Sequence, residues 1–408
     1  MNTQHIIELT ARESYGRLVA YLSVRWRDVE AAEDALADAF LIALETWPRI
    51  GVPDKPEAWL LTTARRRLID RARRGRIHER VMPALQAMSE EVQQRSSSGM
   101  DFPDERLKML LMCTHPSIDP SVRTPLMLQT VLGIDAARIA SSFIVKPSTM
   151  GQRLTRVKAN LRAKDVKFEM PHPEQWPERL DSVLEAIYAA YGSGWDDVTG
   201  VDERRKGLAE EAIYLGRLLV RFMPEEPEAQ ALLALMLHCE ARRDARRDVG
   251  GNYVPLSEQD MTLWSETMIA EAERCLHRAA QVGRVGRFQL LAAIQSVHAQ
   301  RAWSGRTAWD EIALLYEGLV RLAPTIGAAV GRAAAMAEAQ GPQHGWALLE
   351  AIPSAQVVSY QPYWALAAHL LMRMERHEEA RTAYSRAIGL CADPSVREFL
   401  KRQADHAG

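Results

Sequence analysis

The sequence has little of what marks several common protein classes. Its 408 residues include four cysteines, Cys113, Cys239, Cys275 and Cys391, and none of them forms a CxxC pair. Unpaired thiols so far apart are typical of a reducing compartment. No apolar run approaches the ~20 residues that a membrane helix needs, and the N-terminus lacks a basic segment followed by an apolar one. The sequence therefore predicts a cytoplasmic protein with no membrane segment and no secretion signal.

Motifs that carry catalysis are missing as well. The chain has no phosphate-binding glycine loop, no HExxH pair and no nucleophile elbow. Cys113 and His115 are close enough in sequence to share a metal ion, but two scattered ligands of this kind are more often structural. We therefore predict a non-enzymatic protein that has no catalytic residue, no metal and no cofactor.

What is present predicts helices almost throughout. Ala, Leu, Arg and Glu dominate, β-branched runs are short, and apolar residues recur at three- and four-residue spacing, as in the stripe of Leu36, Phe40, Ala43, Leu44 and Trp47. A length of 408 residues predicts two to four domains. Prolines and a glycine predict that the first of these helices ends at Pro48, with a loop to Pro56, where a second helix begins.

Charge is strongly segregated near the N-terminus, although the whole chain carries a net charge of only −2. Residues 28–45 contain six acids and no Lys or Arg, whereas residues 57–80 contain eight arginines and three acids. An isolated arginine helix in a nearly neutral chain indicates a local phosphate-binding surface.

The arginine helix divides into two faces when it is projected at about 100° per residue. Leu61, Ala64, Leu68 and Ala72 form an apolar stripe. A solvated charged helix is the alternative interpretation, but such a face usually mixes signs and this one has only Asp70. Trp59 has two interpretations, a core residue or a platform for base stacking. The residues that we predict to contact nucleic acid are Trp59, Thr62, Thr63, Arg65, Arg66, Arg67, Arg73 and Arg74.

A second basic site lies within residues 133–162. Asp135 can cap a helix, residues 144–146 form a turn, and Pro147 or Ser148 opens a second helix with the stripe Met150, Leu154, Val157 and Leu161. Two short helices with a tight turn describe a helix-turn-helix, whose second helix enters the major groove. Gln152 and Arg156 can read base edges. Ser148, Thr149, Arg153 and Lys158 are better suited to phosphates.

The order and spacing of these motifs resemble the sigma-70 superfamily of RNA polymerase sigma factors, in the extracytoplasmic-function group. The matching segments are AAEDALADAFLIAL at 31–44, WLLTTARRRLIDRARR at 59–74 and TMGQRLTRVKANLR at 149–162, so the resemblance covers roughly residues 8–165. The remainder resembles the tetratricopeptide-like extension of one subgroup, most clearly over residues 210–246.

This resemblance implies an all-α fold with four parts. Residues 1–80 would be sigma region 2, 81–103 a linker, 104–168 region 4 with the helix-turn-helix, and 169–408 a tetratricopeptide-like array. The implied partners are bacterial core RNA polymerase, through its β′ clamp and β flap, and promoter DNA. Glu33, Asp34 and Asp38 would contact the clamp, the arginine helix the −10 element and the helix-turn-helix the −35 element.

Two positions depart from the pattern of the family. The helix before the recognition helix usually carries a glutamate where this chain has Arg138, and the subgroup's Asn-Glu-Gly-Tyr motif is replaced by Tyr-Gly-Ser-Gly-Trp at 191–195. The change at Arg138 affects a local contact and not the fold, whereas the change at 191–195 alters whatever that motif does.

The C-terminal half fits a helical repeat in its last segment, where Trp364, Ala380, Tyr384 and Ala387 occupy tetratricopeptide positions. Stacked helix pairs are the physical expectation. Such an array can support activity, sense a ligand or protein partner, or only stabilise the chain. We favour a regulatory contact with the sigma domains in the same molecule.

The main hypothesis is therefore an alternative sigma factor that directs promoter recognition and transcription initiation. The alternative is a transcription regulator that uses the helix-turn-helix alone and oligomerises through its repeats.

Overall fold

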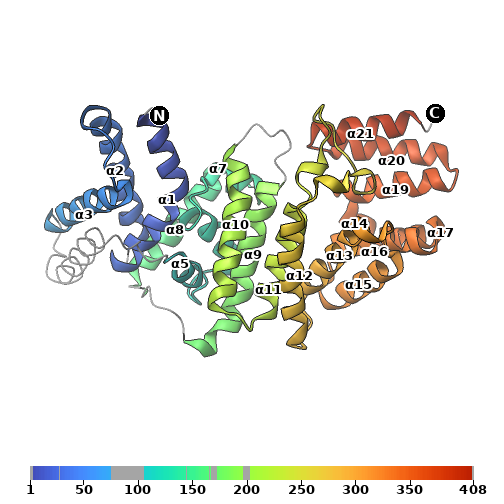
Figure 1. Ribbon diagram of the computed structural model, residues 1–408, viewed down its shortest axis with the longest axis horizontal. Coiled ribbons are helices and arrows are strands. Elements are labelled where there is room, and N and C mark those ends of the chain that lie inside the picture. Colours follow the sequence, from blue (N-terminus) through green and yellow to red (C-terminus); the bar gives the residue numbers. More distant parts are fainter. Residues whose placement is uncertain are drawn as a thin grey trace. The chain divides into compact units, whose positions relative to one another are not determined.

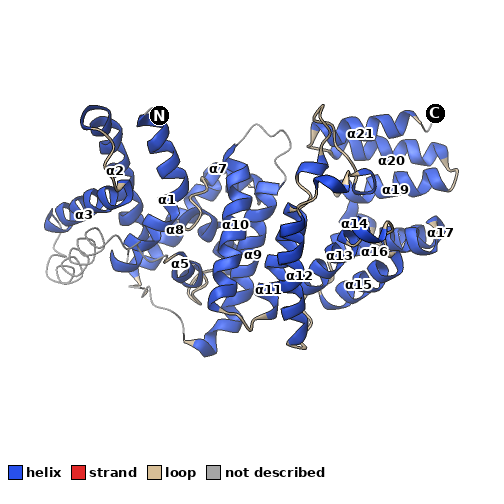
Figure 2. Ribbon diagram, in the orientation of Figure 1, coloured by secondary structure: helices blue, strands red, loops and turns tan. Residues whose placement is uncertain are grey.

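The computed structural model describes residues 3–26, 28–74, 105–143, 145–164, 166, 172–195 and 203–406. Within these ranges the regular elements are helices, and the β-structure is limited to one isolated bridge between Arg247 and Tyr253 (Figure 2). The all-α fold class is confirmed. The predicted linker at 81–103 lies outside the described residues. None of the helices in these ranges combines the length and the apolar character needed to cross a bilayer.

By their contacts the residues group into two compact units, described separately below. The first unit contains residues 1–195 and 204–215, and the second contains 196–203 and 216–408. The helices that lie wholly in the first unit are α1 (Thr3–Trp26), α2 (Val29–Ile50), α3 (Pro56–Arg74), α5 (Arg106–Cys113), α6 (Pro120–Thr130), α7 (Ala136–Ser142), α8 (Pro147–Ala163) and α9 (Trp176–Trp195) (Figure 1). Helix α10 (Glu203–Phe222) contributes Arg204–Leu215 to this unit.

Helices α1, α2 and α3 pack on one another around a core that includes Leu18, Leu36, Trp47 and Leu61. Helix α2 starts where Asp28 accepts a hydrogen bond from the amide of Ala31 at 3.0 Å, which satisfies a free N–H of the first turn. These contacts fix the acidic helix and the arginine helix against each other.

Two details of this region differ from the sequence predictions. Helix α2 continues through Pro48 to Ile50, so the expected end at Pro48 is wrong. Pro48 lies in the last turn, where its missing N–H leaves the carbonyl of Leu44 without its helical donor, and the helix ends soon after at Gly51, whose positive φ of 87° favours glycine. Leu44 belongs to the apolar stripe by its spacing, yet it is 45% exposed.

Helices α7 and α8 lie where the sequence predicts a pair of short helices, and they pack on each other. Asp135 accepts hydrogen bonds from the amides of Ala137 and Arg138 at 2.9 and 3.0 Å, which confirms it as a cap. Helix α8 begins at Pro147, and Met150, Leu154 and Leu161 are buried while Val157 is half-buried. Helix α9 covers α5 and α6 in the same unit.

The second unit is a succession of packed helices. They are α11 (Pro227–Glu240), α12 (Glu266–Gln281), α13 (Arg287–Ala299), α14 (Arg301–Ser304), α15 (Trp309–Leu322), α16 (Ile326–Gln340), α17 (Pro342–Glu350), α18 (Ser354–Val357), α19 (Gln361–Arg373), α20 (His377–Leu390) and α21 (Pro394–Asp405). The short 3-10 turns are Pro173–Gln175 in the first unit, and Asp244–Arg246, Leu256–Glu258 and Met261–Leu263 in the second.

Neighbouring helices of the second unit pack in pairs, such as α15 with α16 and α19 with α20. Ala380, Tyr384 and Ala387 are buried in the last of these pairs, and Trp364 packs at its edge. Pairwise packing of this kind buries the apolar face of each helix against its neighbour, as expected for a helical array.

Candidate nucleic-acid interface

The arginine helix α3 is anchored at its first turn. The side chains of Ser14 and Arg17 on α1 donate hydrogen bonds to the Glu57 carboxylate, which joins the start of α3 to the core of the three helices. Leu60, Leu61, Ala64 and Leu68 are buried. The opposite face of α3 is therefore held outward by a fixed inner stripe.

The predicted contact residues of α3 differ in their exposure. Arg66 and Arg67 are exposed, and Thr62, Thr63 and Arg65 are half-buried. Burial lowers the pKa of Arg65 below its usual range, and the neighbouring Arg66 adds to this effect. The side chains of Arg73 and Arg74 lie outside the described part. Arg65 and Arg66 thus repel each other, and an anion placed beside them would relieve this repulsion.

Trp59 packs into the structure instead of standing free. Its ring meets that of Trp47 edge to face, with centroids 5.3 Å apart and an angle of 70° between the planes. It lies at the edge of the core of α1–α3 and is half-buried. Base stacking by Trp59 stays a prediction.

Asp34 and Asp38, two of the three predicted polymerase-binding acids, face α3. Asp34 accepts a hydrogen bond from Arg71 at 2.8 Å, and Asp38 lies 3.8 Å from Arg67. A hollow of about 310 Å³ between these pairs is lined by both aspartates and both arginines. All four side chains are roughly half exposed, so each ion pair is weak and can exchange its partner.

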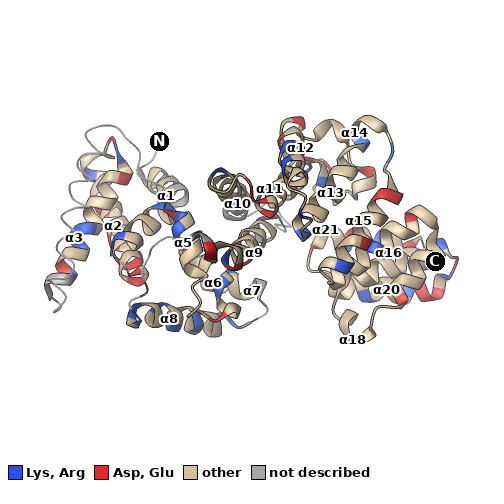
Figure 3. Ribbon diagram, turned by 90° about the horizontal axis from the view of Figure 1, so that it is seen from below, with Lys and Arg blue, Asp and Glu red and all other residues tan. Residues whose placement is uncertain are grey.

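Helix α8 presents its predicted contact face to solvent. Ser148, Gln152, Arg153 and Arg156 are exposed, and Thr149 is half-buried. The long side chains of Gln152 and Arg156, one turn apart, have the donors and acceptors that read base edges in a major groove. Lys and Arg follow α8 along its length (Figure 3).

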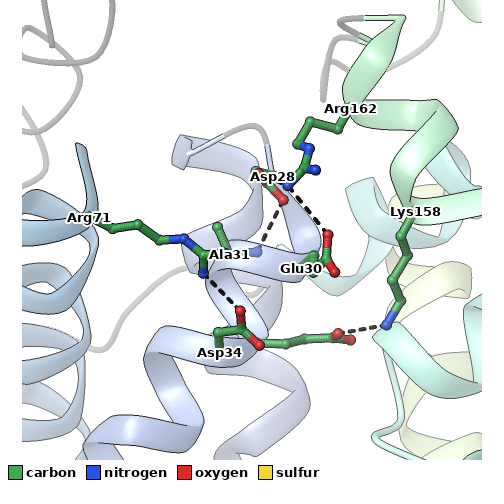
Figure 4. Close-up of polar contacts among 8 residues, drawn as sticks. Asp28, Glu30, Ala31, Asp34, Arg71, Lys158 and Arg162 are labelled. Carbon is green, nitrogen blue, oxygen red and sulfur yellow. Dashed lines mark hydrogen bonds and ion pairs between the residues drawn. The ribbon is translucent and has the colours of Figure 1, made fainter. Parts of the chain in front are cut away.

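Lys158 is the exception on α8, because it faces protein. Its ammonium group lies 2.6 Å from the carboxylate of Glu33 on α2, and the two side chains are only 9% and 19% exposed. One turn later, Arg162 lies 3.4 Å from Glu30 and 3.7 Å from Asp28. Figure 4 shows α2 contacted by Arg71 from one side and by Lys158 and Arg162 from the other. The pairs made by Lys158 and Arg162 join positions more than 120 residues apart, and no sequence signal indicates them.

The pKa of the Glu33 carboxyl is affected by its contact with Lys158 and by its burial. Burial raises the pKa of Glu33 above its usual value, although Lys158 acts in the opposite direction. The same surroundings raise the pKa of Tyr15 to about 12, through burial first and then through Glu33 and Asp34. Asp34 and Glu30 add to the rise at Glu33, so Lys158 acts there against both burial and two neighbouring acids.

Cys113 and His115 lie in different environments. Cys113 is buried beside Thr130, with 3.5 Å between Sγ and Oγ1, and burial raises its pKa to about 12. His115 accepts a hydrogen bond at Nδ1 from the amide of Ser117 at 3.1 Å. Among the described residues, no group of three His, Cys, Asp or Glu side chains is arranged to hold a metal ion.

Comparison with known protein families identifies the kind of domain to which two parts of the chain are similar. Residues 11–77, which include α2 and α3, match the family described as Sigma-70 region 2, and residues 179–280 match a family of unknown function, DUF6596. The N-terminal part of the chain is thus a sigma-70 region 2 domain, a domain of non-enzymatic transcription initiation factors.

The chain is also similar, over almost its full length, to an uncharacterized protein of Rhizobium meliloti (strain 1021). The two are 35% identical over 399 residues, which cover 97% of this chain and 93% of the relative. The chain belongs to the family of that protein. In this chain the sigma-70 region 2 match precedes the DUF6596 match. No solved structure matches the chain significantly.

Proposed function

We propose that this chain is an alternative sigma factor of the extracytoplasmic-function group. It binds core RNA polymerase through α2, contacts the −10 element through α3 and the −35 element through α8. The observation that carries the proposal is the region 2 match over residues 11–77, together with the outward arginine face of α3 within it. Helix α8, basic and exposed along Ser148, Gln152, Arg153 and Arg156, supports the second DNA contact.

The proposed polymerase contact uses Glu33, Asp34 and Asp38 against the basic β′ clamp, and region 4 against the β flap. Exposed ion pairs such as Asp34 with Arg71 are worth about 0–1 kcal/mol, so a basic partner helix can replace the arginine at little cost. Leu41 and Leu44, 59% and 45% exposed on the same helix, add apolar area to this surface.

We propose that the C-terminal part supports and regulates these contacts as a tetratricopeptide-like array. Its first helix α9 packs on α5 and α6, and Arg179 of α9 donates a hydrogen bond to the carbonyl oxygen of Leu111 at 3.4 Å. Arg106 of α5 forms an ion pair with Glu211 of α10 and lies over the ring of Tyr214. Residues beyond 168 thus pack on α5 and α6, the two helices that precede the helix-turn-helix in the chain.

Run-off transcription tests the proposal. The full-length protein is added to purified core polymerase on fragmented genomic DNA, and discrete transcripts absent without the protein are expected. A transcription regulator with repeat-mediated oligomerisation would instead bind DNA fragments without core polymerase and start no transcripts. That second outcome would overturn the sigma-factor assignment.

A further inference from the structure

The connection between α11 and α12 is long for an array of packed helices. It runs through residues 241–265, whereas α15 is joined to α16 by residues 323–325 and α19 to α20 by residues 374–376. Connections longer than about 12–15 residues are uncommon in compact domains, and most of them have a function. The length of this connection therefore indicates that it does more than join two helices.

Residues 246–254 of the connection form a narrow hairpin. Arg247 and Tyr253 pair as an antiparallel bridge. At the tip, the Asp248 amide donates to the carbonyl oxygen of Asn252 at 3.0 Å, and the Asn252 amide donates back to the Asp248 carboxylate at 2.9 Å. The hairpin is thus held by its own hydrogen bonds and can move as one piece.

The hairpin contacts α21, which lies at the other end of the second unit in sequence. Arg247 donates to the hydroxyl of Ser395 at 2.5 Å and lies 3.2 Å from the carboxylate of Asp393, the cap of α21. The Tyr253 ring meets that of Phe399 edge to face, with centroids 5.5 Å apart. In Figure 1 this part of the chain, drawn in yellow, lies beside the red α21. An ion pair and a ring contact therefore hold the first half of α21.

The segment that follows the hairpin is fixed to the body of the unit. Arg301 of α14 donates to the carbonyl oxygens of Leu256 and Gln259 at 2.9 and 3.2 Å. Gln259 is buried, and its side-chain amide donates to the carbonyl oxygen of Val254 at 3.3 Å. Trp264 is buried in an apolar cluster that this connection forms with α12 and α13. The hairpin is therefore a projection from the α11–α14 region that reaches α21.

A helical array without such a contact is open at its end. Each helix pair then touches only its neighbours, and the terminal helix frays first. Here α21 packs on α20 and is also held by Arg247, which lies 146 positions before Asp393. The two side chains are 31% and 19% exposed, so water reaches their ion pair and the contact can open and close again.

We propose that residues 246–259 are a latch that closes the helical array from α11–α12 onto α21, and that the latch and α21 open together. Release of Arg247 and Tyr253 frees α21 while the pairs α15–α16 and α19–α20 stay packed. Closure couples the two ends of the array directly, so a change at α21 reaches α11–α12 without passing through the helices between them. The latch belongs to the second unit alone, so it does not depend on the sigma-factor function.

Hydrogen exchange of the full-length protein, measured by mass spectrometry of its peptides, tests whether the latch and α21 open together. Arg247→Gln removes the cation from the latch, and Phe399→Leu removes the aromatic ring from α21. Since hydrogen bonds to charged groups are among the stronger ones, we expect Arg247→Gln to speed exchange about tenfold in the latch and in α21. Phe399→Leu should speed exchange in the same two segments. Wild-type exchange in α15 and α16 would show that both variants fold.

The decisive measurements are those across the contact, namely α21 in Arg247→Gln and the latch in Phe399→Leu. Arg321→Gln is the matched control, because it removes the same charge from an exposed ion pair with Glu317 within α15. This control should exchange as the wild type in both segments. The proposal is overturned if either variant speeds exchange only in the segment that carries the substitution. Equal acceleration throughout the second unit would also overturn it, because the array would then open only as a whole.

Discussion

Arg156 is the residue on α8 with the clearest expected role in base recognition. It is exposed one turn after Gln152, on the face opposite the buried Met150 and Leu154. Arg156→Ala should cost about 1–3 kcal/mol at one base pair of the −35 element if its guanidinium makes a bidentate contact. The measurement is binding of the polymerase-bound protein to promoter duplexes that differ at single positions.

Arg153→Ala is the matched control, since Arg153 is equally exposed but is expected to contact a phosphate. Its loss should weaken all duplexes alike and reduce the salt slope by about 1. A uniform loss with Arg156→Ala would show that Arg156 binds the backbone and not a base.

His298 makes stability depend on pH in the second unit. Its ring meets that of Trp309 edge to face, and burial, followed by Arg242 and Arg301, lowers its pKa from 6.5 to about 4. Between pH 4 and pH 6.5 His298 is therefore protonated in the unfolded chain but not in the folded chain. The free energy of unfolding consequently falls as the pH drops below about 6.5. At pH 5 the loss is about 2 kcal/mol relative to pH 8.

Urea unfolding of the full chain at both pH values, followed by tryptophan fluorescence, measures this effect. His298→Gln should lose about 2 kcal/mol less than wild type on acidification. His344→Gln, at an exposed histidine, should behave as the wild type. An equal pH dependence in wild type and His298→Gln would contradict the assignment.

At the scale of one element, α2 carries the proposed polymerase contact. Asp34→Lys combined with Asp38→Lys should abolish binding to core polymerase, because the basic clamp would meet two cations. The fold should survive, since the exposed pairs with Arg71 and Arg67 are worth only about 0–1 kcal/mol each. Pull-down on immobilised core polymerase and helical circular dichroism measure the two effects.

The control for α2 is Asp181→Lys with Asp405→Lys, which changes the net charge equally at two exposed acids elsewhere. This double variant should retain polymerase binding. Undiminished binding by the α2 variant would instead place the polymerase contact on another helix.

Helices α2, α3 and α8 also show what the sequence could predict. Local chemistry predicts the start of α3 at Pro56 and the cap at Asp135, and both are confirmed. The predicted stripe of α8 is buried at three of its four positions, with Val157 half-buried. Leu44 could not be placed, because its exposure depends on which neighbours α2 has and not on its own spacing. The partner of Lys158 lies 125 positions away and depends on tertiary packing that periodicity does not encode.

At the scale of the whole molecule, the result of a truncation that tests the C-terminal part depends on where the chain is cut. Helix α9 buries Leu180, Leu184, Ile187 and Tyr191, and it packs on α5 and α6. Removal of a buried side chain of this size costs about 1.5–3 kcal/mol. A fragment of residues 1–168 therefore loses structural support together with any regulation by the second unit.

Three chains separate these effects: residues 1–168, residues 1–215 and the full length. We expect hydrogen exchange in α5 and α6 to be much faster in 1–168 than in 1–215, because only the longer fragment keeps α9 and the Arg106–Glu211 ion pair. Equal exchange in both fragments would show that α9 does not support the helix-turn-helix. Once 1–215 is shown to fold, transcription by 1–215 and by the full length isolates the second unit. Higher activity of the fragment means that this unit inhibits, and lower activity means that it is required.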